Sequence, residues 1–283
     1  MKKLLTLALS SLLALSLLAG CGSNNTAASG SASASTGETV TLKVGASITP
    51  HAEILAQCKP ILAEQGIDLE VVEYTDYVQP NTALEDGSLD ANYFQHINYL
   101  NWFNSEYGTH LVSAASVHYE PFGIYAGKVA SIADLKDGDE VIIPNDGSNE
   151  TRALLLLQQE GIITLKDGIT AASNATVQDI ASYSVNITIR EMEAAQLTIS
   201  LPDVALAVIN GNYALQGGLN AATDALAIES ADGDAAQEYG NILAVKEGHE
   251  NDPAILALID VLHSDTIRNF INNTYGGAVV PTF

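Results

Sequence analysis

An arginine stands in the first turn of an expected helix that follows a buried strand. The strand-like run Glu140–Pro144 leads into polar turn residues, and the helical pattern of Glu150–Gln159 has Arg152 in its first turn. Free N–H groups and the helix dipole favour an anion at such a position, and a guanidinium binds a carboxylate through two parallel hydrogen bonds. The pattern therefore predicts a carboxylate site at Arg152. A solvated arginine, or one paired with Asp146, fits the pattern equally well.

A second candidate site gathers aromatic, amide and imidazole side chains directly after a weak strand. The segment Asp90–Leu100 reads DANYFQHINYL. Aromatic rings with a few polar groups are typical of a pocket for a small ligand. Tyr77 precedes a turn at Gln79–Asn81 and could supply another aromatic wall. Taken alone, His96 is more typical of a structural histidine.

A third candidate is the end of the apolar run Val204–Ile209, where Asn210 follows a buried strand. Its amide could bind an amine or a carboxylate, although capping the next helix is the commoner role of such a residue. Enzyme signatures are missing: the sequence has no nucleophile elbow, no phosphate-binding loop, no dinucleotide motif and no zinc-protease motif. The six histidines show no metal-ligand spacing. We therefore expect no enzyme, no metal site and no cofactor.

The elements that must position these residues alternate between strand and helix patterns from residue 38 onward. Such an alternation predicts an α/β fold with largely parallel sheets. Two α/β units follow one another without a long linker, which predicts two lobes: residues 38–121 with 240–283, and residues 122–239. Ligands of open α/β sheets bind beyond the carboxyl ends of strands, so we expect a ligand cleft between the lobes.

The N-terminus has the pattern of a lipoprotein export signal. Lys2 and Lys3 precede a short apolar run, which ends in Leu-Ala-Gly before Cys21. We expect residues 1–20 to be removed and Cys21 to be lipidated. The low-complexity segment to residue 37 would act as a flexible tether. These patterns predict a protein anchored on the extracytoplasmic face of the cell membrane.

Composition narrows the possible partners. The chain of 283 residues has 34 Asp and Glu against 11 Lys and Arg, a net charge of −23. Loss of the signal with its two lysines changes this to −25. An acidic surface argues against nucleic acid, and a hydrophobic fraction of 47% excludes a disordered chain. We expect Cys58 to pack in a helical core and Pro60 to kink or break that helix.

In these segments the chain resembles the NlpA-type lipoproteins, the methionine-binding components of ABC importers. The resemblance runs in order through residues 39–283. Its most specific parts are Asp76–Asn81, Asp90–Leu100, Pro144–Arg152, Leu154–Gln158, Ala205–Asn210 and Gly276–Val279.

The resemblance implies a type II-like periplasmic-binding-protein fold with a free amino acid between the lobes. Eight residues match the ligand site of the family: Tyr77, Phe94, His96, Tyr99, Asn149, Arg152, Asn210 and Asn241. The first four would surround a thioether side chain, Arg152 with Asn149 would hold the α-carboxylate, and the last two would help to fix the amino and carboxylate groups. Glu150, and Gly211 after Asn210, depart from the family pattern.

We therefore expect a monomeric, lipid-anchored binding protein that captures L-methionine, or D-methionine, and delivers it to a membrane permease driven by an ATPase. Another amino acid, a methionine derivative or a short peptide is the first alternative. A surface adhesin or scaffold lipoprotein without a transport role is the second.

Overall fold

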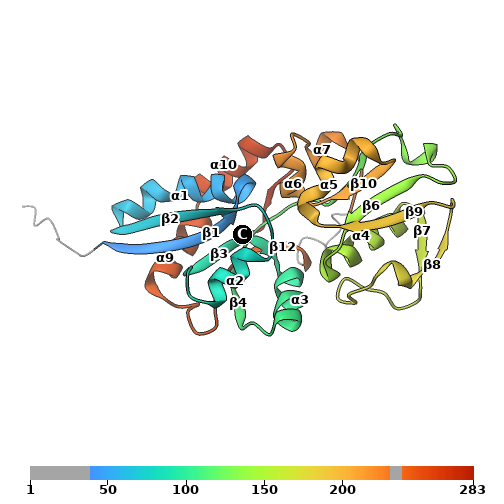
Figure 1. Cartoon of the computed structure of the whole chain (residues 1–283). Coiled ribbons are helices and arrows are strands. Elements are labelled where there is room, and N and C mark those ends of the chain that lie inside the picture. The colour runs from blue at the N-terminus through green and yellow to red at the C-terminus, as the bar shows by residue number, and fades with distance from the viewer. Residues whose placement is uncertain (1–38, 230–237) are drawn as a thin grey trace, which may run out of the picture. The chain divides into compact units, whose positions relative to one another are not determined.

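The computed structural model describes residues 39–229 and 238–283, which belong to one compact unit (Figure 1). The predicted export signal, the lipidation site Cys21 and the tether lie outside the described residues. Within the described ranges, the helices are all too short or too polar to cross a membrane.

The first of two mixed sheets has six strands. Its β1 and β2 run parallel along eight residue pairs, from Val40 opposite Ile67 to Ser47 opposite Tyr74. In spatial order the strands are β13 (Val280–Pro281), β4 (Leu111–Tyr119), β12 (Gly240–Lys246), β3 (Ala91–His96), β1 (Val40–Ser47) and β2 (Ile67–Tyr74). The accompanying helices are α1 (Glu53–Glu64), α2 (Gln79–Glu85), α3 (Ile97–Tyr107), α9 (Pro253–Leu262) and α10 (Asp265–Tyr275). Helices α9 and α10 contact α1 although they are far from it in the sequence (Figure 1).

The second sheet has five strands, all from residues 123–228. In spatial order they are β11 (Ala225–Ile228), β5 (Gly123–Ala126), β10 (Leu206–Ile209), β6 (Glu140–Pro144) and β9 (Thr188–Met192). Four helices accompany it: α4 (Gly147–Gln159), α5 (Ala194–Ser200), α6 (Gly211–Gln216) and α7 (Ala221–Asp224). Strands β7 (Ile163–Leu165) and β8 (Ile180–Tyr183) form a separate pair. Short irregular or 3₁₀ turns lie at Ile48–Ala52, Ile132–Asp134, Val177–Asp179 and Leu201–Asp203.

Each sheet carries its own apolar core. Buried side chains of the first sheet, such as Val44, pack against α1 and α9 residues such as Ile54 and Leu258. Those of the second, such as Val141, pack against the leucines of α4, of which Leu154 is fully buried. The prediction of largely parallel sheets is wrong, because β12 is antiparallel to both β3 and β4. Strand β4 carries the chain toward the second sheet and β12 carries it back, so the two neighbours run in opposite directions.

The helix around Pro60 is continuous, so the predicted break is wrong. Pro60 lies inside α1 on its exposed side, where water can bond the carbonyl that lacks a backbone donor. Ile54, Leu55 and Leu62 hold the other face in the core. Cys58 is fully buried among them, as predicted, and burial raises the pKa of its thiol to about 12.

Candidate functional site

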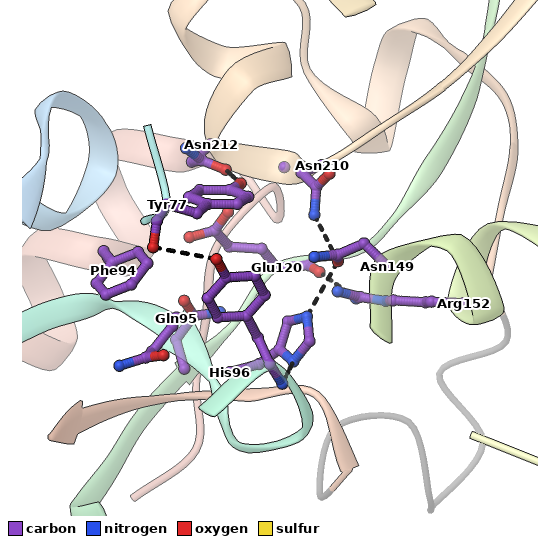
Figure 2. Close-up of a pocket in the computed structure, with 12 residues that line it drawn as sticks. Tyr77, Phe94, Gln95, His96, Glu120, Asn149, Arg152, Asn210 and Asn212 are labelled. Carbon is purple, nitrogen blue, oxygen red and sulfur yellow. Dashed lines mark hydrogen bonds between the residues drawn. The ribbon is translucent and has the colours of Figure 1, made fainter. Parts of the chain in front are cut away.

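All eight predicted site residues line one pocket of about 320 Å³. They come from both sheets and their surroundings: β3, α3 and β12 contribute Phe94, His96, Tyr99 and Asn241, α4 contributes Asn149 and Arg152, and Tyr77 and Asn210 precede α2 and α6 (Figure 2). Four further residues line the pocket that were not predicted as ligand contacts: Gln95, Glu120, Gly211 and Asn212.

Aromatic rings form the apolar part of the pocket. The Tyr77 ring centroid lies 5.8 Å from Phe94, 5.5 Å from Tyr99 and 5.0 Å from Tyr213. The Tyr99 hydroxyl donates to the Tyr77 carbonyl at 3.1 Å, which ties α3 to the segment before α2. Tilted and edge-to-face rings at these separations are favourable. The arrangement leaves a fixed aromatic wall that suits a flexible apolar side chain.

His96 links this wall to the polar part of the pocket. It caps helix α3, since its Nδ1 accepts from the Tyr99 backbone N–H at 3.1 Å. Its Nε2 therefore carries the proton and donates to Asn149 Oδ1 at 3.0 Å. Burial, and then the charge of Arg152, lower the pKa of His96 to about 3. The imidazole is thus neutral at physiological pH.

Both polar atoms of the Asn149 side-chain amide form hydrogen bonds. Asp146 caps α4, and its carboxylate accepts from the backbone N–H of Asn149 at 2.9 Å and from Nδ2 at 3.0 Å. The Oδ1 atom accepts from His96 and from Asn210 Nδ2 at 2.8 Å. Asn149 therefore joins α4 to β3 and to the start of α6. Because Asp146 is the cap, α4 begins three residues before the predicted start at Glu150.

Arg152 is buried and paired, but its partner is Glu229 rather than Asp146. Its Nε donates to Glu229 Oε2 at 2.8 Å, and its Nη2 donates to Glu229 Oε1 and to the Glu120 carbonyl, the latter at 3.0 Å. The guanidinium carbon lies 4.2 Å from the Tyr239 ring centroid. Burial lowers the pKa of Arg152, but the ion pair with Glu229 outweighs this and leaves it above its usual value. None of these three hydrogen bonds involves the Nη1 atom.

A buried acid–histidine cluster lies under the pocket. His118 Nε2 is 2.7 Å and His51 Nε2 is 3.4 Å from Glu120 Oε1. Burial lowers the pKa of His51 to about 4 and that of His118 to about 3. Burial raises the pKa of Glu120, although His51 and Arg152 oppose that shift. The three side chains are close enough to hold a metal ion, but their facing atoms already contact one another, and His51 Nε2 also bonds Asn241 Oδ1 at 2.9 Å.

Two amide atoms in the pocket wall are buried without a partner in the described structure. They are Asn210 Oδ1, an acceptor, and Asn212 Nδ2, a donor. Asn210 precedes α6 but makes no side-chain capping bond, so the alternative role as a helix cap is not realised. Unsatisfied buried amide groups are costly. Both residues line the pocket, and a ligand with a donor and an acceptor would satisfy the two atoms if it reached them.

Glu150 does not face this pocket. Its Oε1 accepts from the Val177 backbone N–H at 2.9 Å. The carboxylate that departs from the family pattern therefore adds no direct contact to the anion site. Glu229, which no sequence pattern indicated, becomes a partner of Arg152 only through tertiary folding, because the two residues are 77 positions apart.

Known proteins of one family are similar to this chain. The family model of the NlpA lipoprotein matches residues 42–283. The methionine-binding lipoprotein MetQ of Bacillus subtilis (strain 168) is 41% identical over 271 residues, which are 94% of this chain and 93% of the relative. A solved nutrient binding protein from Burkholderia cenocepacia bound to methionine is 41% identical with a TM-score of 0.82, covering 86% of this chain and all of that one. A solved structure from Ruminococcus gnavus ATCC 29149 is 54% identical, with a TM-score of 0.84, and covers 86% of this chain and 99% of that one.

Proposed function

Since the chain belongs to the NlpA lipoprotein family, we propose that it captures methionine outside the cytoplasm and delivers it to an ABC importer. It has the mixed α/β fold of its solved relatives, the periplasmic-binding-protein type. The family is a class of substrate-binding proteins, so the pocket residues bind the ligand and no covalent step occurs.

The observation that carries the proposal is the polarity of the pocket. A donor, Asn212 Nδ2, and an acceptor, Asn210 Oδ1, are buried without a partner in the described structure, and both residues line the pocket together with Arg152 and the aromatic rings. A zwitterionic amino acid offers the complementary groups: its carboxylate accepts from Arg152 and this donor, and its ammonium donates to the acceptor. The thioether of methionine then lies among Tyr77 and its neighbouring rings, where a sulfur–aromatic contact contributes about 0.3–1.5 kcal/mol.

The other predicted site residues complete this arrangement. Phe94 and Tyr99 lie on either side of the thioether. His96 holds the side-chain amide of Asn149 through a hydrogen bond. Asn241, held by His51, faces the amino and carboxylate groups together with Asn210. Each contact to the ligand is part of the proposal.

Delivery requires the site to open and close. We assign residues 38–121 with 240–283 to one lobe and residues 122–239 to the other, with hinges near Glu120–Gly123 and Tyr239–Asn241. Strand β4 ends at Tyr119 and β5 begins at Gly123, so the first crossing is short. Short inter-lobe segments can absorb the backbone change of a hinge closure. Lipidation at Cys21 would keep this monomeric body at the extracytoplasmic face of the membrane, beside its permease and ATPase.

Isothermal titration of ligand-stripped protein tests the proposal. We expect heat with L-methionine, and the same panel with D-methionine, other amino acids, methionine derivatives and methionine-containing dipeptides separates the alternatives. Heat with another ligand and none with methionine would overturn the assignment. Mass spectrometry of the small molecule that co-purifies gives an independent answer. Lack of heat with every member of the panel would favour an adhesin or scaffold.

A further inference from the structure

We propose that Glu120 is a specificity-determining residue that selects ligands with an α-ammonium group, its carboxylate accepting a hydrogen bond from that group. This inference rests on the proposed binding of a free amino acid. The residues that match the family pattern assign the amino group only to asparagines, and neither that pattern nor the composition points to Glu120.

The position of Glu120 in the pocket wall is the first observation. It lines the pocket among the candidate ligand-binding residues (Figure 2) although only 5% of its surface is exposed. Its side chain packs against Gly211, where a Cβ atom would come within 2.8 Å of Glu120 Oε2. The residue before Gly211 is Asn210, whose Oδ1 is buried without a partner. Glu120 and Asn210 therefore give this part of the wall two acceptors, because Glu120 packs against the residue that follows Asn210.

The carboxylate has acceptor capacity left for a ligand. One oxygen, Oε1, contacts His118 and His51, and the backbone N–H of Asn212 provides a further donor. A carboxylate has about four acceptor sites, so at least one remains. The two histidines hold the Glu120 side chain in place. His118 is itself held by Tyr93, whose hydroxyl contacts His118 Nδ1.

Charge balance gives the second argument. The positive charge of Arg152 is already matched by Glu229 in a two-bonded ion pair. The imidazoles that face Glu120, His51 and His118, have lowered pKa values and are neutral near pH 7. Tyr77 also lies near, and burial keeps its hydroxyl protonated by raising the pKa. Burial raises the pKa of Glu120 itself, so its ionised form needs a cation nearby. The described lining residues give it no full cationic partner of its own, and an ammonium group supplies one.

A matched pair of ligands tests this role. Methionine and 2-hydroxy-4-(methylthio)butanoate share the carboxylate and the thioether, but the second has a hydroxyl in place of the ammonium. A hydrogen-bonded buried charge is worth about 10- to 100-fold in affinity, so we expect the wild-type protein to bind the hydroxy acid weaker by about that factor. In Glu120→Gln, which keeps the shape and removes the charge, we expect methionine to bind at least about tenfold weaker and the difference between the two ligands to fall below about threefold.

Glu140→Gln is the matched control, since it removes the same charge from a residue that pairs with Arg190 away from the pocket. It should leave both affinities unchanged. Circular dichroism melting shows whether Glu120→Gln folds. If it does not fold, the wild-type comparison alone still decides: equal binding of the two ligands overturns the inference, as does unchanged selectivity in a folded Glu120→Gln protein. Failure of the wild-type protein to bind methionine at all would instead overturn the proposed function.

Discussion

Arg152 binds Glu229 through one edge of its guanidinium group, which carries Nε and Nη2. Nε and Nη2 face the two carboxylate oxygens, and Nη2 also reaches the Glu120 carbonyl. The Glu229 carboxylate accepts in addition from the Tyr119 hydroxyl and from the Phe122 backbone N–H at 3.1 Å. The ion pair therefore fixes the arginine against the segment that leaves the first sheet. A ligand carboxylate would meet Nη1 rather than the two-nitrogen fork that the sequence suggested.

Replacement of Arg152 by alanine should affect both binding and folding. The ligand carboxylate loses a charged donor, and we expect methionine affinity to fall by at least about 2 kcal/mol. Glu229 is left as a buried, unpaired carboxylate, so the free energy of unfolding should fall by about 3–5 kcal/mol. Isothermal titration measures the first effect and urea denaturation the second.

The exposed ion pair on the second sheet provides the control for this change. Arg190 donates to Glu140 at 2.7 Å, with 43% of the arginine side chain exposed. Exposed pairs contribute about 0–1 kcal/mol, so Arg190→Ala should change stability little and affinity not at all. A folded Arg152→Ala protein with unchanged methionine affinity would refute the site assignment.

Regular elements of ordinary length were predictable from the sequence. The bounds of β6 agree with the predicted strand-like run Glu140–Pro144, because an apolar stretch there is followed directly by clear turn residues. Several short elements were missed, namely β5, β7, β8, β11 and α5 to α7. Their three to seven residues are too few to show a period, and their formation depends on partners that are distant in the sequence.

The candidate site shows the same limit. Residues close together in the sequence, such as Phe94, His96 and Tyr99, were identified from one segment. Glu120 and Glu229 were not, because a single acidic residue in an acidic chain has no distinguishing pattern. Their function arises from tertiary contacts: Glu229 reaches Arg152 from the end of β11, and Glu120 reaches two histidines from different elements.

Glu150 should make stability depend on pH. Burial and the nearby Glu191 raise the pKa of Glu150 from its usual 4.5 to about 8. The folded protein therefore binds this proton more tightly than the unfolded chain between those pH values. Its stabilising contribution is full below pH 4.5 and is lost as the pH rises toward 8, by at most about 1.4 kcal/mol per pH unit.

Glu150→Gln removes this titration while its amide oxygen can still accept from Val177. We expect the variant to gain stability relative to the wild type as the pH rises from 5 to 8, in urea denaturation at each pH. Glu64→Gln, on the exposed end of α1, controls for the loss of one negative charge. Parallel stability curves for wild type and Glu150→Gln would show that this carboxyl group does not titrate as described.

A methyl group at Gly211 should disturb the acidic wall of the pocket. The added Cβ would lie 2.7 Å from Glu120 Cβ, closer than real contacts allow. We expect Gly211→Ala to lose about 1–3 kcal/mol of stability through overpacking and to bind methionine at least about tenfold weaker by titration. Gly45→Ala, which would meet Leu89 at 2.6 Å in the first sheet, should lose similar stability but keep its affinity. If Gly211→Ala and Gly45→Ala bind methionine with equal affinity, Glu120 does not contribute to ligand binding.

Pro60 should be a position at which the protein can be stabilised. It occupies the interior of α1, where it removes a backbone hydrogen bond that alanine would restore. Proline is about 3 kcal/mol less favourable than alanine in a helix interior, and part of this is offset because proline restricts the unfolded chain. We expect Pro60→Ala to raise the free energy of unfolding by about 1–2 kcal/mol in urea denaturation. Pro253→Ala is the control: Pro253 is exposed at the first position of α9, where proline is favourable, and its replacement should give no gain. A loss of stability in Pro60→Ala would mean that the core packing of α1 depends on a local bend at Pro60.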